Sequence, residues 1–411
     1  MKVVVAQKGS REHFLAARAL HDRGHLAALV ADWYAPRLPW LHTLSQRLGL
    51  APLKRLMAAR CDTLPDALVY SFGRHGIRSR QREIAALRHG APYAAYLSTD
   101  AAFAQRVAAL DLPPHDVFFG FSYASLEAMA VAKAKGKLVL LDQIDPGPPE
   151  ARLVQAERKA WPNYALPMTH APAAYYDRLR QEWNLADAIL VNSEWTRDLI
   201  VEEGVDPKKI DILPLAYAPP NQRPEQHQPH DGPLRVLWLG TVTLRKGISY
   251  LVEAAKRFAP SDIEITVAGR IDISAAAIAQ APACIRWVGP IPRPQTEALY
   301  RAADVFVLPT VSDGFALTQL EALAQGVPVI VTPNCARIVE EGRTGFVVPA
   351  RDVTALAEAL AHCRDHANDL AAMAPACIDR ANAFSHETYA QRLLEIIENR
   401  MALKQQQKTT V

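Results

Sequence analysis

Short apolar runs alternate with amphipathic stretches along most of the chain. In the first half, strands are predicted at residues 2–6 (KVVVA), 25–32, 117–121 (VFFGF), 137–142 (KLVLLD) and 188–193. Helices are predicted at 12–23, 125–135, 175–185 and from residue 195 onward. Continuous apolar strands that alternate with helices are typical of a parallel sheet covered on both faces.

The same alternation restarts after a proline-rich segment at residues 218–233, which contains five prolines. Neither a strand nor a long helix can cross such a segment, so we place a domain boundary there. Strands are then predicted at 234–240, 263–269, 285–289, 305–309, 328–333 and 345–349, and helices after residue 247, at 295–302, at 316–324 and in three segments after 353. The sequence therefore predicts an α/β protein with two doubly wound domains, 1–217 and 218–385, that face a central cleft.

Composition narrows the class of protein. The chain has 411 residues, of which 50% are hydrophobic and 22% are charged, as in globular proteins. No apolar stretch approaches the roughly 20 residues that span a bilayer, and the N-terminus does not resemble a secretory signal. The five cysteines are scattered and unpaired in spacing, which favours the cytoplasm and no metal site. A net charge of +3 gives no reason to expect nucleic-acid binding.

Positive charge is concentrated in residues 37–88, where ten Lys and Arg face three Asp and Glu. Leucines and a tryptophan are interleaved with these cations. Two interpretations stay open: a solvated basic face over a helical layer, or contact with the anionic inner face of the plasma membrane.

Two strand ends in the second half carry candidate chemistry, because ligands bind beyond the carboxyl ends of the strands in open α/β sheets. The first is LGTVTLRKG, in which Gly240 permits close approach of the backbone and the adjacent Arg245 and Lys246 could neutralise a diphosphate. The alternative is that these cations simply cap a surface loop.

The second strand end is SDGFALTQLEALAQGVPVIVTP, residues 312–333. Gly314 removes steric bulk at the start of a helix, so free N–H groups near Phe315 and Ala316 can face an anion. Glu321 lies about 7.5 Å further along the helix axis and can reach a ribose while the helix start holds phosphate. The alternative for Glu321 is an exposed carboxylate on a helix surface.

Together these segments resemble retaining glycosyltransferases of family 4. DGFALTQLEALAQGVPVI is similar to the signature of that family, in which an acidic residue precedes a Glu by eight positions. LADAILVNSEWTRDLI, VLWLGTVTLRKGISYLVEA, ITVAGR, VGPI, LYRAADVFVLPTVSDGF and GRTGFVVPARDVTALAEAL follow the order of the family. The likeness is strong from Leu185 to about Leu360.

The resemblance implies a GT-B fold, with a nucleotide sugar on the second domain, the acceptor on the first, and a last helix (about 386–411) that crosses back. Catalytic roles would fall to Asp313, Lys246 and Arg245. The donor would lie against Glu321, Gly314, Phe315, Ala316, Leu317, Gly240, Thr241, Gly9 and Ser10. The family normally needs no metal or other cofactor, transfers with retention, and uses a donor phosphate oxygen to take the acceptor proton.

Three residues depart from the pattern of the family. Asp313 replaces the usual Glu, Thr241 replaces an arginine, and Ala316 replaces a common glycine, a change that we expect to be mild if the helix begins there. The first domain lacks the histidine that many relatives place after a strand. Asp142, Gln143 or Asp145 would occupy that position, and His13 is a further candidate for the acceptor site.

The leading hypothesis is an enzyme that moves a sugar from a nucleotide diphosphate sugar to a lipid-linked or glycan acceptor, in surface polysaccharide or glycolipid assembly. One alternative is a non-catalytic partner that kept the nucleotide pocket. A nucleotide-sugar epimerase or a phosphorylase on the same scaffold is another.

Overall fold

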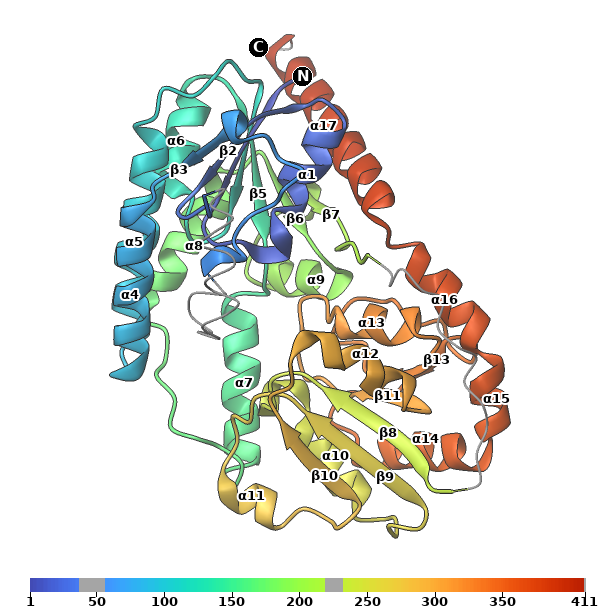
Figure 1. Cartoon of the computed structure of the whole chain (residues 1–411). Coiled ribbons are helices and arrows are strands. Elements are labelled where there is room, and N and C mark those ends of the chain that lie inside the picture. The colour runs from blue at the N-terminus through green and yellow to red at the C-terminus, as the bar shows by residue number, and fades with distance from the viewer. Residues whose placement is uncertain (37–55, 219–231, 410–411) are drawn as a thin grey trace.

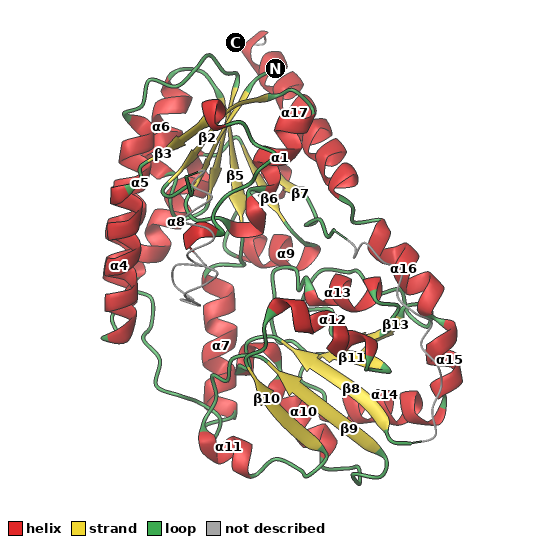
Figure 2. Cartoon of the chain, viewed as in Figure 1, coloured by secondary structure: helices red, strands yellow, loops and turns green. Residues whose placement is uncertain are grey.

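The computed structural model describes residues 1–36, 56–218 and 232–409, which form two parallel sheets with helices on their faces (Figures 1 and 2). In the first half the strand order is β3-β2-β1-β4-β5-β6-β7, and in the second it is β10-β9-β8-β11-β12-β13. Every strand pair is parallel. The predicted α/β class with two doubly wound sheets is confirmed.

The first sheet contains β1 (Val3–Gln7), β2 (Leu26–Ala31), β3 (Val69–Ser71), β4 (Val117–Phe121), β5 (Leu138–Gln143), β6 (Ala188–Val191) and β7 (Ile210–Ile212). Its helices are α1 (Leu15–Asp22), α4 (Arg74–Arg88), α5 (Pro92–Ala108), α6 (Leu126–Ala134), α7 (Pro148–Ala160), α8 (Ala173–Leu185) and α9 (Glu194–Glu202). Short 3-10 turns lie at η1 (Arg11–His13), η2 (Asp66–Leu68) and η3 (Pro207–Lys209). The central strands β1 and β4 are buried over their whole length, which explains their unbroken apolar sequence.

The second sheet contains β8 (Leu234–Leu239), β9 (Ile263–Ala268), β10 (Ile285–Gly289), β11 (Val305–Leu308), β12 (Val329–Val331) and β13 (Gly345–Val347). Its helices are α10 (Ile248–Ala255), α11 (Ala275–Ala279), α12 (Arg293–Arg301), α13 (Thr318–Ala324), α14 (Val353–Asp365), α15 (Ala367–Ala372) and α16 (Ala374–Asn382), with the 3-10 turn η4 (Leu244–Lys246) before α10. Most of the proline-rich segment between β7 and β8, residues 219–231, lies outside the described residues.

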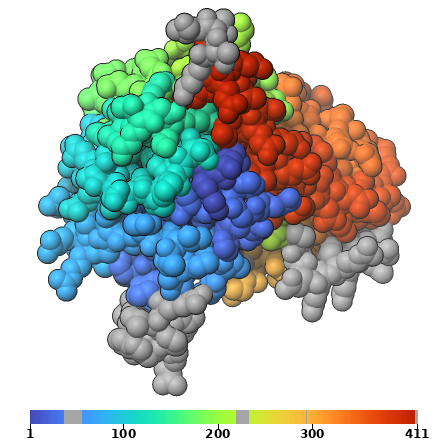
Figure 3. All heavy atoms as spheres, turned by 90° about the horizontal axis from the view of Figure 1, so that it is seen from above, coloured from blue at the N-terminus to red at the C-terminus, as the bar shows by residue number. Residues whose placement is uncertain are grey.

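The last helix, α17 (His386–Thr409), returns to the first half of the chain. Its residues Tyr389, Leu393 and Ile397 are buried in the same apolar core as α1. Figure 3 shows this red helix lying along the blue N-terminal segment. Polar contacts extend the seam, because Arg400 pairs with Asp211 at 2.7 Å.

Helix α7 crosses in the opposite direction, from the first half to the second (Figure 1). Leu153 and the following Trp161 pack against the core of the second half. Glu157, which is buried, accepts a hydrogen bond from Tyr250 Oη at 2.8 Å and pairs with Arg351 at 2.6 Å. This helix was not predicted, and it ties the two halves together.

Three expectations about elements are wrong in detail. The helix expected from residue 12 begins at Leu15, because Glu12, His13 and Phe14 have φ values of 51°, 50° and 60°, which lie outside helical geometry. The helix expected from residue 316 begins at Thr318. Four helices rather than three follow residue 353.

Candidate functional site

A cavity of about 430 Å³ lies between the two halves, at the carboxyl ends of both sheets. From the first half it is lined by Arg11, Glu12, Ile144, Asp145, Glu150, Asn192 and Leu215. From the second half it is lined by Arg245, Lys246, Asp313, Gly314, Phe315, Ala316, Leu317 and Thr318. Eight of the fifteen residues that the sequence predicts for the site therefore meet in one place.

The loop after β8 presents the two predicted cations. Thr243 Oγ1 accepts the N–H of Lys246 at 3.3 Å and so starts the η4 turn. Gly247 ends that turn with a φ of 73°, and a Cβ atom there would lie 1.7 Å from the carbonyl oxygen of Pro309. Only glycine fits this position, so the LRKG sequence fixes where Arg245 and Lys246 leave the backbone.

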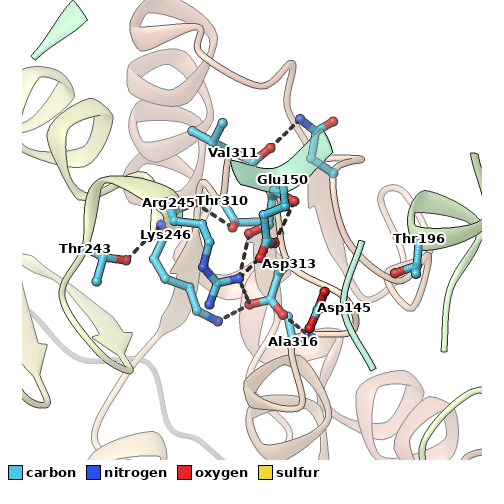
Figure 4. Close-up of polar contacts among 12 residues, drawn as sticks. Asp145, Glu150, Thr196, Thr243, Arg245, Lys246, Thr310, Val311, Asp313 and Ala316 are labelled. Carbon is cyan, nitrogen blue, oxygen red and sulfur yellow. Dashed lines mark hydrogen bonds and ion pairs between the residues drawn. The ribbon is translucent and has the colours of Figure 1, made fainter. Parts of the chain in front are cut away.

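Asp313 is the partner of both cations (Figure 4). Its carboxylate forms an ion pair with Lys246 and lies 4.0 Å from Arg245. Burial by itself would raise the pKa of Asp313, but Lys246 and Arg245 outweigh that effect, so the pKa lies below its usual value. Asp313 is therefore ionised at neutral pH and neutralises charge that an anionic ligand would otherwise meet.

The same carboxylate corrects the prediction about free N–H groups at the helix start. Asp313 Oδ1 accepts hydrogen bonds from the N–H groups of Phe315 at 3.3 Å and Ala316 at 3.1 Å. These two donors are occupied because the acidic residue stands two and three positions before them, the spacing of a side-chain cap.

Glu150 at the start of α7 completes the charge network from the other half of the chain (Figure 4). Its Oε1 accepts Ser312 Oγ at 2.9 Å and Arg245 Nη1 at 3.3 Å, and Trp195 Nε1 donates to Ser312 Oγ at 3.0 Å. Burial raises the pKa of Glu150, and Arg245 opposes that shift. Sequence reasoning missed Glu150; its position soon after the end of β5 was the available signal.

Glu321 lies on α13 and does not line the cavity. The side chain is neither fully buried nor fully exposed, and its Oε2 accepts a hydrogen bond from Tyr300 Oη at 2.9 Å. Tyr300 was not predicted; it is 1% exposed and holds the carboxylate in place. The carboxylate on this helix is thus partnered by a protein hydroxyl and not simply left in solvent.

Gly240 and Thr241, at the end of β8, also lie outside the lining of the cavity. The backbone of Gly240 is instead approached by Gly269, where a Cβ atom would lie 1.7 Å from the carbonyl oxygen of Gly240. Gly269 thus allows the close packing of these two neighbouring strand ends.

Of the site residues predicted in the first half, some line the cavity and others do not. Asp145 lines the cavity, whereas Gly9, Ser10, His13 and Asp142 do not. The N–H of Gly9 donates to Asp32 Oδ1 at 2.8 Å, which holds the loop after β1. His13 is exposed. Burial raises the pKa of Asp142 well above its usual value, and the nearby Glu12 adds to the shift.

Two further carboxylates of the first half have structural roles. Glu182 accepts the N–H groups of Tyr123, Ser125 and Leu126 at 2.6–3.0 Å, so it caps α6. Asp187 pairs with Lys404 at 2.7 Å.

In the described ranges, no three His, Cys, Asp or Glu side chains are grouped so that they could hold a metal ion. Over the same ranges, no helix is long and apolar enough to cross a membrane.

Comparison with known proteins places this site in context. Residues 233–366 match the family described as Glycosyl transferases group 1. The chain is 30% identical over 194 residues to a D-inositol 3-phosphate glycosyltransferase from Pseudarthrobacter chlorophenolicus, which covers 42% of this chain and 46% of that protein. The match thus spans about half the length of this curated relative.

Two solved structures are similar over nearly the whole chain. A sucrose-phosphate synthase from Thermosynechococcus elongatus has a TM-score of 0.61 at 18% identity and covers 98% of this chain and 100% of its own. The Anabaena protein HepE, solved in complex with UDP, has a TM-score of 0.60 at 14% identity and covers 97% of this chain and 100% of its own. The chain has the GT-B fold.

Ala316 has a φ of 64°, so the replacement of the usual glycine is not mild. A residue with a Cβ atom in this conformation costs about 1 kcal/mol or more. We expect Ala316→Gly to raise the free energy of unfolding by about 0.5–1 kcal/mol, measured by urea denaturation. The control Ala361→Gly, inside α14, should lower it by about 1 kcal/mol. A loss of stability in Ala316→Gly would contradict the assigned strain.

The lowered pKa of Asp313 predicts a pH dependence. A carboxyl whose pKa is depressed in the folded state adds stability above its unfolded pKa of about 3.9, and this contribution disappears as the pH falls through the folded value. We expect Asp313→Asn to lower the free energy of unfolding by about 1–3 kcal/mol at pH 7, since Lys246 loses its partner.

The difference between wild type and Asp313→Asn should shrink below pH 4, as urea denaturation at several pH values would show. Asp177→Asn, which breaks an exposed pair with Arg180, serves as the control and should have little effect. A difference that stays constant from pH 7 to pH 3 would rule out the ion pair as its cause.

Proposed function

We propose that this chain is a glycosyltransferase that transfers a sugar from a nucleotide diphosphate sugar to an acceptor hydroxyl. The observation that carries the proposal is the meeting of Arg245, Lys246 and Gly314 in one interdomain cavity. The similarity of residues 233–366 to Glycosyl transferases group 1 and of the fold to the UDP-bound HepE supports it.

In this proposal the two domains bind different substrates. Residues 218–385 bind the nucleotide sugar, and residues 1–217 with the returning helix, about 386–411, bind the acceptor. The cavity lies at the carboxyl ends of both sheets, which is where ligands of open α/β sheets bind. This location supports the division.

The diphosphate would be bound by Arg245 and Lys246, which supply the positive charge that a metal gives other transferases. Those cations are paired with Asp313 and Glu150. Binding then means an exchange of anionic partners, after which Asp313 is free to accept hydroxyls of the donor sugar. Glu321, held by Tyr300, accepts the ribose hydroxyls.

The transfer proceeds with retention, and a donor phosphate oxygen takes the proton of the acceptor hydroxyl, so the cavity needs no protein nucleophile. The acceptor is a glycan or lipid-linked sugar, and the reaction belongs to surface polysaccharide or glycolipid assembly in the cytoplasm. The loop after β1, with Gly9 and Ser10, approaches the donor phosphates when the halves close.

Binding of the donor tests this proposal. We expect one class among UDP-, GDP-, ADP- and CMP-linked sugars to raise the thermal midpoint, since a ligand at a hundredfold excess over its Kd adds about 2.7 kcal/mol. Loss of the charged hydrogen-bond acceptor in Glu321→Ala should weaken that ligand about tenfold or more. Glu358→Ala, which removes an exposed carboxylate from α14, is the matched control.

Unchanged affinity in Glu321→Ala would disprove the ribose assignment. Turnover of the radiolabelled donor separates an enzyme from a non-catalytic partner, which would bind the nucleotide sugar and neither hydrolyse nor transfer it.

We also propose contact with an anionic membrane surface through the basic segment 37–88. Residues 37–55 of this segment lie outside the described residues, so the support comes from α4. This helix exposes five arginines, Arg74, Arg78, Arg80, Arg82 and Arg88. Ile84 and Leu87, on the same helix, are 43% and 59% exposed.

Vesicle sedimentation at low salt tests the membrane contact. Binding to phosphatidylglycerol vesicles should exceed binding to phosphatidylcholine vesicles, and Arg78→Glu with Arg82→Glu should weaken it by more than tenfold, because each cation adds about 1 kcal/mol. Arg286→Glu, on the exposed strand β10, is the control for net charge. Equal sedimentation with both lipids would discard the proposal.

A further inference from the structure

Five tyrosines gather beside the cavity, on elements of the first half that the donor does not use. Tyr93 and Tyr96 lie in the first turns of α5, Tyr175 and Tyr176 lie in the first turn of α8, and Tyr123 follows β4. The ring centroids of Tyr123 and Tyr175 are 4.7 Å apart with nearly parallel planes. Tyr175 meets Tyr93 at 5.2 Å, edge to face. We call these five residues the tyrosine cluster.

The backbone of the cluster is held in an unusual conformation. Tyr123 has a φ of 73°, which costs a residue with a side chain about 1 kcal/mol or more and is concentrated at functional sites. Two buried groups fix it: the N–H of Tyr123 donates to Glu182 Oε2 at 2.6 Å, and its carbonyl accepts Arg178 Nε at 2.7 Å. Arg178 is itself held by two bonds to Glu127. These hydrogen bonds hold the Tyr123 side chain in one orientation.

In this orientation the Tyr123 hydroxyl reaches the edge of the cavity. Tyr123 Oη donates to Asp145 Oδ1 at 2.9 Å, and the N–H of Gly147 donates to the same oxygen at 2.8 Å. Asp145 lines the cavity. Both bonds fall on Oδ1, and the described residues give Oδ2 no hydrogen-bond donor. Asp145 thus joins the cluster to the cavity and has an acceptor oxygen to offer a ligand.

The remaining four rings are suited to a polar ligand with an apolar face. Tyr93, Tyr96, Tyr175 and Tyr176 are all half-buried. Within the described part of the chain, no hydrogen bond reaches the hydroxyl groups of these four residues. An aromatic ring offers an apolar face and a phenol offers a donor and an acceptor, which is the pairing that a sugar ring needs.

The charges around the cluster select against an anionic ligand. Asp100 and Asp145 both help to raise the pKa of Tyr175 after the larger effect of burial. The nearby cation Lys8 is already bound by Glu83 at 2.6 Å, by Thr99 Oγ1 at 2.8 Å and by Asp100. Arg152 and Arg178, two further cations near the rings, are paired with Glu203 and Glu127 at 2.6 Å each. A phosphate group would meet the carboxylates with these three cations already paired, so an uncharged ligand is favoured.

We propose that the tyrosine cluster and Asp145 bind an uncharged saccharide, the part of the acceptor that lies next to the hydroxyl that is glycosylated. This inference rests on the proposed function and narrows its acceptor to a neutral sugar ring stacked on tyrosine. Asp145 orients a hydroxyl of that ring toward the donor cavity. A purely structural role, in which the rings only join α5 to α8, is the competing explanation.

Saturation-transfer NMR on the full chain tests the proposal with maltose, lactose and N,N′-diacetylchitobiose as neutral probes and glucose 6-phosphate as the charged one. With UDP present, we expect at least one neutral disaccharide to bind. Tyr93→Ala and Tyr176→Ala should each weaken it about tenfold, which corresponds to about 1.4 kcal/mol. The Phe variants keep the ring and should stay within about threefold of wild type. Leu403→Ala, at the far end of α17, is the control.

The affinity for UDP, measured separately by thermal shift, should not change in any tyrosine variant. If UDP does not bind and another of the four donor classes does, the saccharide measurement is repeated with that nucleotide. If none of UDP, GDP, ADP and CMP binds, the proposed function falls, and the saccharide measurement is read independently of it. The inference is overturned if UDP binds and none of the neutral disaccharides does, or if glucose 6-phosphate binds more tightly than they do. It is also overturned if the Ala variants lose thermal stability and keep the saccharide affinity of wild type.

Discussion

The site depends on one electrostatic arrangement, in which two cations of the second half are balanced by carboxylates from both halves. Lys246 pairs with Asp313, and Arg245 reaches Glu150 on α7. Charges removed from water must be paired. Lys246 has its partner within the second half, whereas the carboxylate nearest to Arg245 is Glu150 of the first half, at 3.3 Å. This pair requires α7 to lie against the loop that carries Arg245.

The fold was largely predictable because its strands are written as unbroken apolar runs. VFFGF became β4 over the predicted residues, and the strands of the second half began within one residue of their expected starts. The missed elements have physical reasons. β3 and β7 are three-residue edge strands, too short for periodicity to reveal, and α7 begins with two prolines and has charged residues at five of its 13 positions.

The candidate site was only partly predictable. In LRKG a glycine ends a turn directly after two adjacent cations. Arg245 and Lys246 were therefore found from sequence. Glu150 and Tyr300 were not, because their partners lie 95 and 21 residues away in the chain. The availability of the Phe315 and Ala316 N–H groups was misjudged for a related reason: whether Asp313 turns to accept them depends on the left-handed conformation of Ala316, which the sequence does not mark.

Helix α7 has a mechanical consequence. Its 13 residues make a rod of about 20 Å, with Glu150 engaged at one end and Glu157 anchored to Tyr250 and Arg351 toward the other. Arg245, Tyr250 and Arg351 all belong to the second half, so α7 is fastened along its length to the half of the molecule that its own chain segment does not belong to. A displacement of the second half would therefore carry this helix with it.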